Sequence, residues 1–178
     1  MKVFGKRFSD DESGSATVEF VVLFIPFISL VFAVFEAGWL MTRYMMLDRG
    51  MDVAVRELRL NIGDLADPTQ DKVRDRICEA ALILPDCQTT LIVELKKLDM
   101  AAAYPKNSPD CFDRAEDAVN PKKGIDPNDE LRSEIMFVRA CVLVDPIFPG
   151  LEFGLLLPKD ANGAHQMVTF SAFMNEPL

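Results

Sequence analysis

The hydrophobic pattern changes abruptly near the start of the chain. Residues 1–14 are mostly polar, whereas Glu36 is the only charged residue from Phe20 through Thr42. At a rise of about 1.5 Å per residue, a helix of this length crosses the ~30 Å hydrocarbon core of a bilayer. A core helix of a globular protein is rarely apolar on every face over such a length. The pattern therefore predicts a membrane-spanning helix.

A cleaved secretory signal is the main alternative interpretation of this segment. Such a signal has an apolar run of roughly 7–15 residues, followed by small residues at the cleavage site. Ala33, Ala37 and Gly38 are small, but the apolar run is longer and a helical pattern continues beyond it. We therefore expect the apolar segment to remain in the mature protein.

Helical periodicity continues past the apolar segment. Apolar residues recur there every three or four positions on one helix face, at Leu47, Met51, Ala54, Val55, Leu58 and Ile62. With Gly63 as a stop signal, the helix is predicted to run from about Ala16 to Ile62. This apolar stripe fits packing against the chain's own sheet, and it also fits contact between subunits.

The remaining sequence predicts a second helix and a small sheet. The second helix is expected over 68–84, with Asp67 as its N-cap and Pro68 in its first turn. A Thr-rich and Val-rich stretch with alternating positions predicts a strand over 88–96, and strands are also predicted over 133–144, the strongest of the three, and over 165–174, after the turn at 160–163. Prolines mark 104–130 as a long loop and 145–158 as a connection. This order of elements predicts an α+β fold, in which the long N-terminal helix lies across an antiparallel sheet of three or four strands.

The connection over 145–158 is rich in apolar residues. The large ones are Phe148, Leu151, Phe153 and the run from Leu155 to Leu157. They fit an exposed patch that binds a partner, and they fit ordinary core packing equally well.

Composition narrows the classes of function. The 178 residues suffice for one domain, and the net charge is -9 with a pI of about 4.6. An acidic chain without a basic cluster beyond its first residues argues against a nucleic-acid partner. No nucleophile elbow, phosphate-binding loop or zinc-protease motif occurs, and His165 is the only histidine. We therefore expect no catalytic residue, no metal and no cofactor, and we do not predict an enzyme.

The four cysteines are Cys78, Cys87, Cys111 and Cys141. None forms a CxxC pair, and structural zinc usually needs closely spaced Cys or His ligands, so a zinc site is not expected. An even number of cysteines beyond a membrane segment fits disulfides in an oxidising compartment. Three pairings are possible for four cysteines. Proximity in the sequence favours Cys78–Cys87 and Cys111–Cys141.

A short motif marks the entry to the apolar segment. Gly14 ends the polar stretch, and Glu19 follows five residues later, beside Phe20 and inside the apolar run. An ionised carboxylate at that depth is costly and usually has a partner. Cleavage after Gly14 would supply one, the positive amine of Ser15 in the same chain or in a neighbouring subunit, and the helix N-terminus adds partial positive charge. Alternatively, Glu19 is an ordinary acid of a helix start at the membrane surface.

Residues 14–60 resemble the N-terminal region of TadE-like proteins, the pseudopilins of the tight-adherence (Flp) type IV pilus system. An Arg-containing amphipathic stretch follows the span in both, and the other matching positions are Gly14, Glu19, Phe20, Pro26, Glu36 and Gly38. The chain has Trp39 where the family often has Arg, a difference that lies outside the cleavage motif. The resemblance covers about a quarter of the chain.

The resemblance implies a pilin-like fold and a role in the assembly or initiation of a pilus. A prepilin peptidase would cut after Gly14, so that 1–14 is a leader, 15–42 is the transmembrane part of the helix and 43–178 is a periplasmic α+β domain that includes the helix continuation. The basic residues before the span favour a cytoplasmic N-terminus, and the resemblance implies an inner-membrane location. The implied partners are a sister pseudopilin, the major Flp pilin, the prepilin peptidase, inner-membrane platform proteins and membrane lipid.

A second hypothesis keeps the leader in place. In it, the chain is an uncleaved, inner-membrane-anchored periplasmic binding or sensor module, and its membrane helix is only a tether. Glu19 separates the two hypotheses, because a tether does not require a carboxylate inside its apolar run.

Overall fold

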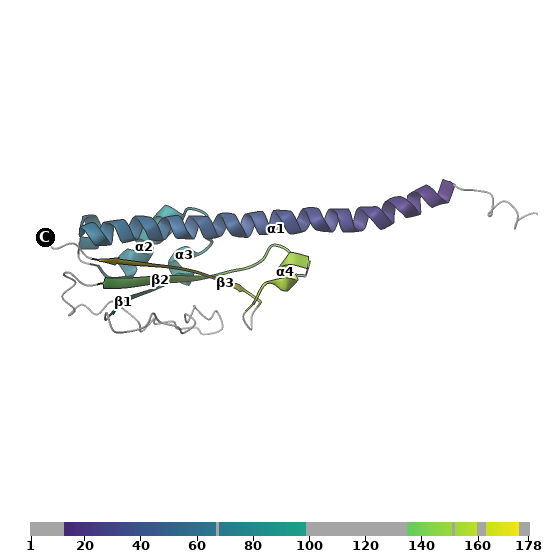
Figure 1. Ribbon diagram of the computed structural model, residues 1–178. Helices are drawn as coiled ribbons and strands as arrows, with labels where there is room; N and C mark the ends of the chain where they lie inside the picture. Colours follow the sequence, from purple (N-terminus) through teal and green to yellow (C-terminus); the bar gives the residue numbers. More distant parts are fainter. Residues whose placement is uncertain (1–12, 67, 99–134, 151, 160–162, 175–178) are drawn as a thin grey trace, which may run out of the picture.

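The computed structural model describes five stretches of the chain, which are residues 13–66, 68–98, 135–150, 152–159 and 163–174. Most of the predicted leader and the predicted loop over 104–130 lie outside the described residues. Helix α1 (Ser13–Leu60) forms a long rod, and the other labelled elements gather along its C-terminal half and its middle (Figure 1). The predicted α+β arrangement, a long N-terminal helix packed on a small antiparallel sheet, is confirmed.

Helix α1 is one continuous helix of 48 residues. It ends before Asn61, which adopts a left-handed backbone with a φ of 53°. The Ile62 N–H donates to the Glu57 carbonyl at 3.2 Å, and the Asn61 N–H donates to the Leu58 carbonyl at 3.3 Å. These two bonds form a Schellman motif, in which Asn is one of the few residues that tolerate the left-handed position. Asn61 therefore stops the helix, rather than the predicted Gly63.

Helix α2 (Gln70–Ala81) confirms the second predicted helix, but it is shorter at both ends. Its N-cap is Thr69, whose hydroxyl accepts a hydrogen bond from the Lys72 N–H at 3.4 Å. The prediction of Asp67 as the N-cap was therefore wrong, since a threonine two residues later takes the same role. At the other end, Leu82 has a positive φ of 46° and leaves the helical conformation.

The sheet contains three strands, which are β1 (Ile92–Leu98), β2 (Ile135–Val144) and β3 (His165–Met174). The spatial order is β1-β2-β3, and both pairings are antiparallel. The predicted strands over 133–144 and 165–174 are confirmed. Central strand β2 is buried along nearly its whole length, because neighbouring strands pair with both of its edges and its two faces are covered.

The predicted strand over 88–96 began too early. Cys87–Thr90 form a short helix, α3, in front of β1. The hydroxyls of Thr89 and Thr90 each donate to the Asp86 carbonyl at 2.9 Å, which stabilises a helical turn instead of an extended strand. A second short helix, α4 (Glu152–Leu156), lies in the segment that was predicted to be only a connection.

The apolar stripe in the C-terminal half of α1 packs inside this molecule. Leu47, Met51, Ala54 and Leu58 are each at most 5% exposed. They belong to one core cluster with apolar side chains of α2 and β2, such as Val73, Ile77, Val138 and Val142. Packing on the chain's own domain, one of the two interpretations of the stripe, is therefore confirmed for these positions. Ile62, the last predicted member, is 50% exposed and lies beyond the helix end.

Helices α1 and α2 approach each other very closely at Gly50. A Cβ atom at this position would lie 2.6 Å from the backbone carbonyl oxygen of Ile77. About two turns further along α1, Arg76 of α2 donates from Nε and from Nη2 to the Glu57 carboxylate, at 2.9 and 2.6 Å. The missing side chain and the forked ion pair together hold the two helices at a fixed separation.

Candidate functional site

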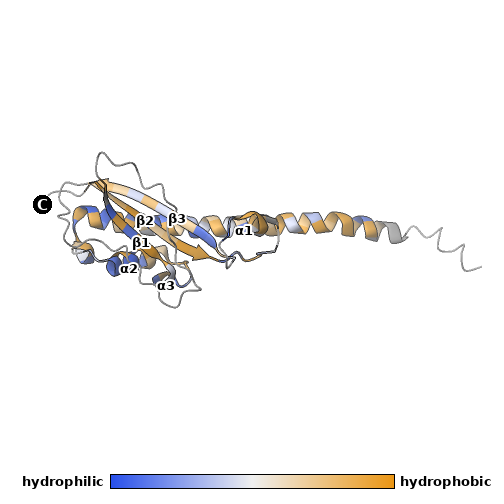
Figure 2. Ribbon diagram, turned by 90° about the horizontal axis from the view of Figure 1, so that it is seen from below, coloured by the Kyte–Doolittle hydropathy of each residue, from blue (hydrophilic) through white to orange (hydrophobic). Residues whose placement is uncertain are grey.

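The N-terminal half of α1 extends away from the domain and is apolar almost throughout (Figure 2). Within the most apolar window of 18 residues, no residue is buried inside the molecule. The helix is long and apolar enough to cross a membrane. Leu23 is 71% exposed and Val34 is 66% exposed. An apolar surface of this extent is stable when lipid or another protein covers it.

Glu36 lies where α1 meets the rest of the molecule, and its surroundings were not predicted. It is only 1% exposed. Its Oε1 atom accepts a hydrogen bond from the Ile147 N–H and its Oε2 atom accepts one from the Phe148 N–H, both at 2.8 Å. Both carboxylate oxygens are therefore engaged by backbone donors of the segment between β2 and α4. We call this arrangement the Glu36 clasp.

Further contacts fix the same segment along α1. The ring of Phe32 lies 4.9 Å from the ring of Phe148, measured between centroids. About two turns beyond Glu36, Arg43 donates from Nη1 to the Asp145 carbonyl at 3.4 Å. The segment that follows β2 is thus held to α1 over about three turns of the helix.

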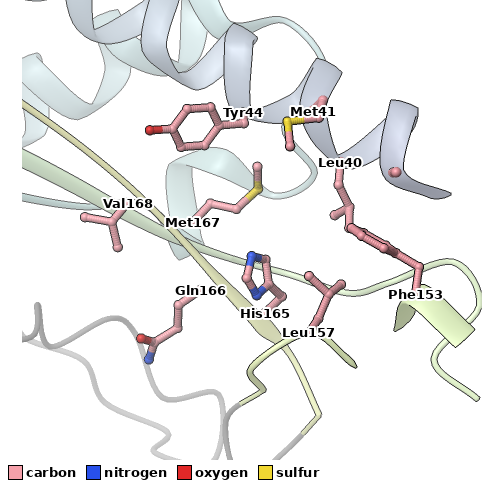
Figure 3. Close-up of a pocket in the computed structure, with 10 residues that line it drawn as sticks. Leu40, Met41, Tyr44, Phe153, Leu157, His165, Gln166, Met167 and Val168 are labelled. Atoms are coloured by element: carbon pink, nitrogen blue, oxygen red, sulfur yellow. The ribbon is translucent and has the colours of Figure 1, made fainter. Parts of the chain in front are cut away.

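An apolar cavity of about 390 Å³ adjoins the clasp between α1, α4 and β3. Leu40, Met41 and Tyr44 of α1 face Met167 of β3 across it, and Phe153 closes one side (Figure 3). Its polar lining is limited to the side of His165 and Gln166, and the Nδ1 atom of His165 lies 2.9 Å from the Pro158 carbonyl oxygen. The cavity therefore resembles a packing gap or an apolar binding site more than a reaction site.

The predicted processing motif lies at the other end of the apolar half. Gly14 and Ser15 fall in the first turn of α1. Glu19 and Phe20 follow on its exposed surface, where the Phe20 ring stacks on Phe24 at 5.3 Å. From Glu19 to the clasp is about 25 Å along the helix, at 1.5 Å per residue. The predicted processing motif and Glu36 therefore lie at opposite ends of the apolar half of α1.

Two further predicted motif positions lie between or beyond these places. Pro26 is inside α1, and the Ser29 hydroxyl donates to its carbonyl at 3.0 Å. Gly38 follows the clasp, and a Cβ atom there would meet nothing within 4 Å. The Thr42 hydroxyl donates to the Gly38 carbonyl at 2.7 Å. Gly38 is thus not required by packing within the described part of this molecule.

Comparison with known protein families finds one match, and it lies within helix α1. The family model of the TadE-like proteins matches residues 14–56. These residues are similar to TadE-like proteins, and we call them the TadE-like segment. No curated protein and no solved structure matches the chain. The TadE-like segment ends inside α1, so the sheet and the short helices lie outside the matched residues.

The TadE-like segment contains Glu36 but not the groups that bind it. Ile147 and Phe148 are about 110 residues further along, and they contribute backbone N–H groups. A backbone donor leaves no residue-type signal in a sequence, so these partners could not be predicted. The available signal was Glu36 itself, the only charge in a long apolar run, because such a carboxylate needs a partner.

Beyond the TadE-like segment, a disulfide joins Cys78 of α2 to Cys87 of α3, which confirms the first predicted pairing. Cys141 of β2 is buried and is also disulfide-bonded. Its predicted partner, Cys111, lies outside the described residues, so the second pairing stays a prediction. The confirmed bond closes a loop of about ten residues next to the core.

Strands β1 and β2 carry a buried ion pair that was not predicted. Glu94 and Arg139 face each other directly in the strand register, and each is 6% exposed. The Arg139 Nε atom donates to the Glu94 carboxylate at 3.0 Å, and Lys96 forms a salt bridge to the same carboxylate. Burial by itself raises the pKa of Glu94, but hydrogen bonds from Lys96 and Arg139 outweigh it, so the pKa is lowered.

Because Glu94 and Arg139 lie opposite each other on paired strands, the ion pair links β1 to β2. Across the described stretches of the chain, no three His, Cys, Asp or Glu side chains come together as metal ligands would. The two candidate sites are the start of the TadE-like segment and the Glu36 clasp.

Proposed function

We propose that the protein is a minor pilin or pseudopilin that takes part in the assembly or initiation of a tight-adherence (Flp) pilus. One observation carries the proposal: the TadE-like segment lies on a single helix whose apolar half projects uncovered while its other half is the core of a small α+β domain. This division of one helix suits a subunit that is stored in a membrane and then packed beside other helices. A structural role in assembly, rather than catalysis, follows from it.

In this proposal, a prepilin peptidase removes the leader after Gly14. The new amine of Ser15 then neutralises Glu19 in the same chain or in a neighbouring subunit. The first test is the N-terminus of the protein isolated from its native cells, determined by mass spectrometry. Ser15 should be the first residue. An intact Met1, or a cut near Ala37, in a cell that has the peptidase would contradict the proposal.

Substitution of the glycine before the cut provides a second test. Gly14→Leu should block processing and pilus formation, because the peptidase must fit the residue that precedes the scissile bond. Gly38→Ala is the matched control, since a Cβ atom at Gly38 meets nothing within 4 Å. It should be processed like the parent chain. Normal processing of both variants would count against cleavage after Gly14.

We further propose that lipid covers the helix only to about Phe35, rather than through Thr42. Glu36 is buried against the β2–α4 segment, and from that point the domain begins to cover α1. A span from Ser15 to Phe35 measures about 30 Å, which is the thickness of the hydrocarbon core. In this proposal, the N-terminus lies in the cytoplasm and the domain lies in the periplasm, an oxidising compartment that suits the Cys78–Cys87 disulfide.

The proposed partners are a sister pseudopilin, the major Flp pilin, the prepilin peptidase, inner-membrane platform proteins and lipid. Assembly with other subunits should depend on Glu19. Glu19→Leu should abolish co-purification with the pilins, whereas Glu79→Leu, at a 72% exposed side chain on α2, should not. Both variants should insert into the membrane, which extraction with alkaline carbonate would check.

A second candidate function is an uncleaved periplasmic binding or sensor module anchored by α1. The apolar cavity of about 390 Å³ favours it, because ligand sites are usually concave and apolar. In that case, Glu19→Leu would leave partner binding unchanged and the protein would be found in membranes but not in purified pili.

A further inference from the structure

Four apolar residues lie before α4 and at its C-terminal end. Ile147 and Phe148 precede α4, and Leu155 and Leu156 are its last two residues. Leu155 is 63% exposed and Leu156 is 84% exposed. Of the large apolar side chains in the described stretches, Leu156 is the most exposed. We call these four residues the apolar tip. The earlier choice between core packing and an exposed patch is thereby resolved for Leu155 and Leu156, which are outside the core.

The position of the apolar tip along α1 is fixed by the contacts at the clasp. The Phe148 ring touches the Phe32 ring, and the Ile147 and Phe148 amides bind Glu36. Along the helix, Phe32 lies about 24 Å and Glu36 about 30 Å from Ala16. If hydrocarbon begins near Ala16, Glu36 sits at the outer edge of the ~30 Å core and Phe32 lies just inside it.

We infer that the apolar tip lies in the outer interface of the same bilayer that α1 crosses, with Leu155 and Leu156 in contact with lipid acyl chains. The inference rests on the membrane span in the proposed function, but it does not require a pilus. The apolar surface of the tip is continuous with that of the span through the Phe32–Phe148 contact. Lipid is therefore the occupant that already surrounds the neighbouring surface.

Two backbone amides of the tip and a nearby lysine have partners that suit this depth. Peptide groups at the edge of hydrocarbon need internal partners, and the Ile147 and Phe148 amides have them in Glu36. Lys159 donates from Nζ to the Pro149 carbonyl at 2.9 Å, and it can extend toward lipid phosphates as lysines at interfaces do. Gly154 keeps α4 against this turn, because a Cβ atom there would lie 2.2 Å from the Phe148 carbonyl oxygen.

Tryptophan fluorescence of the full chain in vesicles tests the inference. Trp39 is the only tryptophan, so a Trp39→Phe background leaves a single reporter in each variant. The test variant is Leu156→Trp. Leu82→Trp is the control in water, because Leu82 is 75% exposed at the end of α2, and Phe27→Trp is the control in the span, 61% exposed. The vesicles are phosphatidylcholine with or without bromine atoms on the acyl chains, which quench nearby tryptophan.

We expect the reporter of Leu156→Trp to emit at shorter wavelength than that of Leu82→Trp and to lose emission in brominated vesicles. Water-like, unquenched emission from Leu156→Trp, together with quenching of Phe27→Trp, would overturn this inference and leave the membrane span intact. A blue-shifted but unquenched reporter would also overturn it, because a protein chain would then cover the tip. If Phe27→Trp is not quenched, the span of the proposed function itself fails. Leu155→Trp repeats the test should Leu156→Trp misfold.

Discussion

Replacing Glu36 with alanine removes both acceptors that hold the β2–α4 segment on α1. The carboxylate binds the Ile147 and Phe148 amides at 2.8 Å each. Hydrogen bonds to a charged group contribute about 1.5–3 kcal/mol each. Because Ile147 is 42% exposed, we take the lower end of this range for both bonds. The local opening free energy of the segment should therefore fall by about 3 kcal/mol.

Amide hydrogen exchange measures this local opening directly. Since about 1.4 kcal/mol corresponds to a factor of ten, the two amides should exchange about a hundredfold faster in Glu36→Ala than in the parent chain. Glu36→Gln retains one acceptor oxygen but points an amide donor at the second N–H, so its effect should be at least half as large in free energy. The measurement is hydrogen exchange with mass spectrometry on the full chain in nanodiscs, following a peptide that contains Ile147 and Phe148.

Two comparisons make the result decisive. Glu79→Ala removes a carboxylate that is 72% exposed and is bonded to Arg76, and it should leave exchange at Ile147 and Phe148 unchanged. Amides in the centre of β2 should keep their protection in every variant, which shows that the domain is still folded. If Glu36→Ala leaves the two amides as protected as in the parent chain, the clasp does not hold the segment and the reasoning is refuted.

Three further predictions concern the domain. Gly50→Ala should lower the free energy of unfolding by about 1–3 kcal/mol, because its Cβ atom would meet the Ile77 carbonyl at 2.6 Å; thermal unfolding measures this. Cys87→Ser should lower it by about 2–3 kcal/mol through the lost loop closure. Added reductant should lower the stability of the parent chain by at least as much, because it also reduces the bond of Cys141. The pKa of Glu94 is lowered by its partners, so the stability from this ion pair is present above its unfolded-state pKa of about 4.3 and is lost as pH falls through the lower folded-state pKa. The thermal midpoint of the parent chain should decline in that acid range.

Each of these predictions has its own control. Gly38→Ala places the same methyl group in open space and should not lower stability. Reductant should lower the stability of Cys87→Ser less than that of the parent chain, because only the bond of Cys141 is left to reduce in the variant; an equal loss in both would contradict the prediction. Glu94→Gln should show a flatter acid dependence from a lower starting midpoint, because Arg139 is left buried with a weaker partner. An acid dependence identical in Glu94→Gln and the parent chain would assign it to other groups.

Elements with strong periodicity were predictable from the sequence. The length of α1 followed from an apolar run and a three-to-four residue repeat, β2 followed from its run of apolar residues, and β3 followed from the turn signal before it. The end of α1 was missed by two residues because Asn61, rather than a glycine, takes the left-handed position. The start of β1 was missed because Thr89 and Thr90 bond locally to Asp86 and so favour a turn over a strand.

The functional site was predictable only in part. Glu36 was noticeable as a charge in an apolar run, but its partners are backbone amides about 110 residues away. The buried pair of Glu94 and Arg139 depends on the register between β1 and β2, which the sequence pattern of the two strands does not fix. In both cases the missing information is long-range pairing in space, which local patterns do not contain.

The continuity of α1 also has a mechanical consequence. The same helix is the apolar span at one end and the centre of the domain's core at the other, without a flexible joint between them. A force that pulls on the domain is therefore transmitted to the span along the axis of one continuous helix. The clasp and the contact between α1 and α2 bear the sideways part of that load. The subunit should accordingly leave a membrane as one rigid body, with its domain still folded.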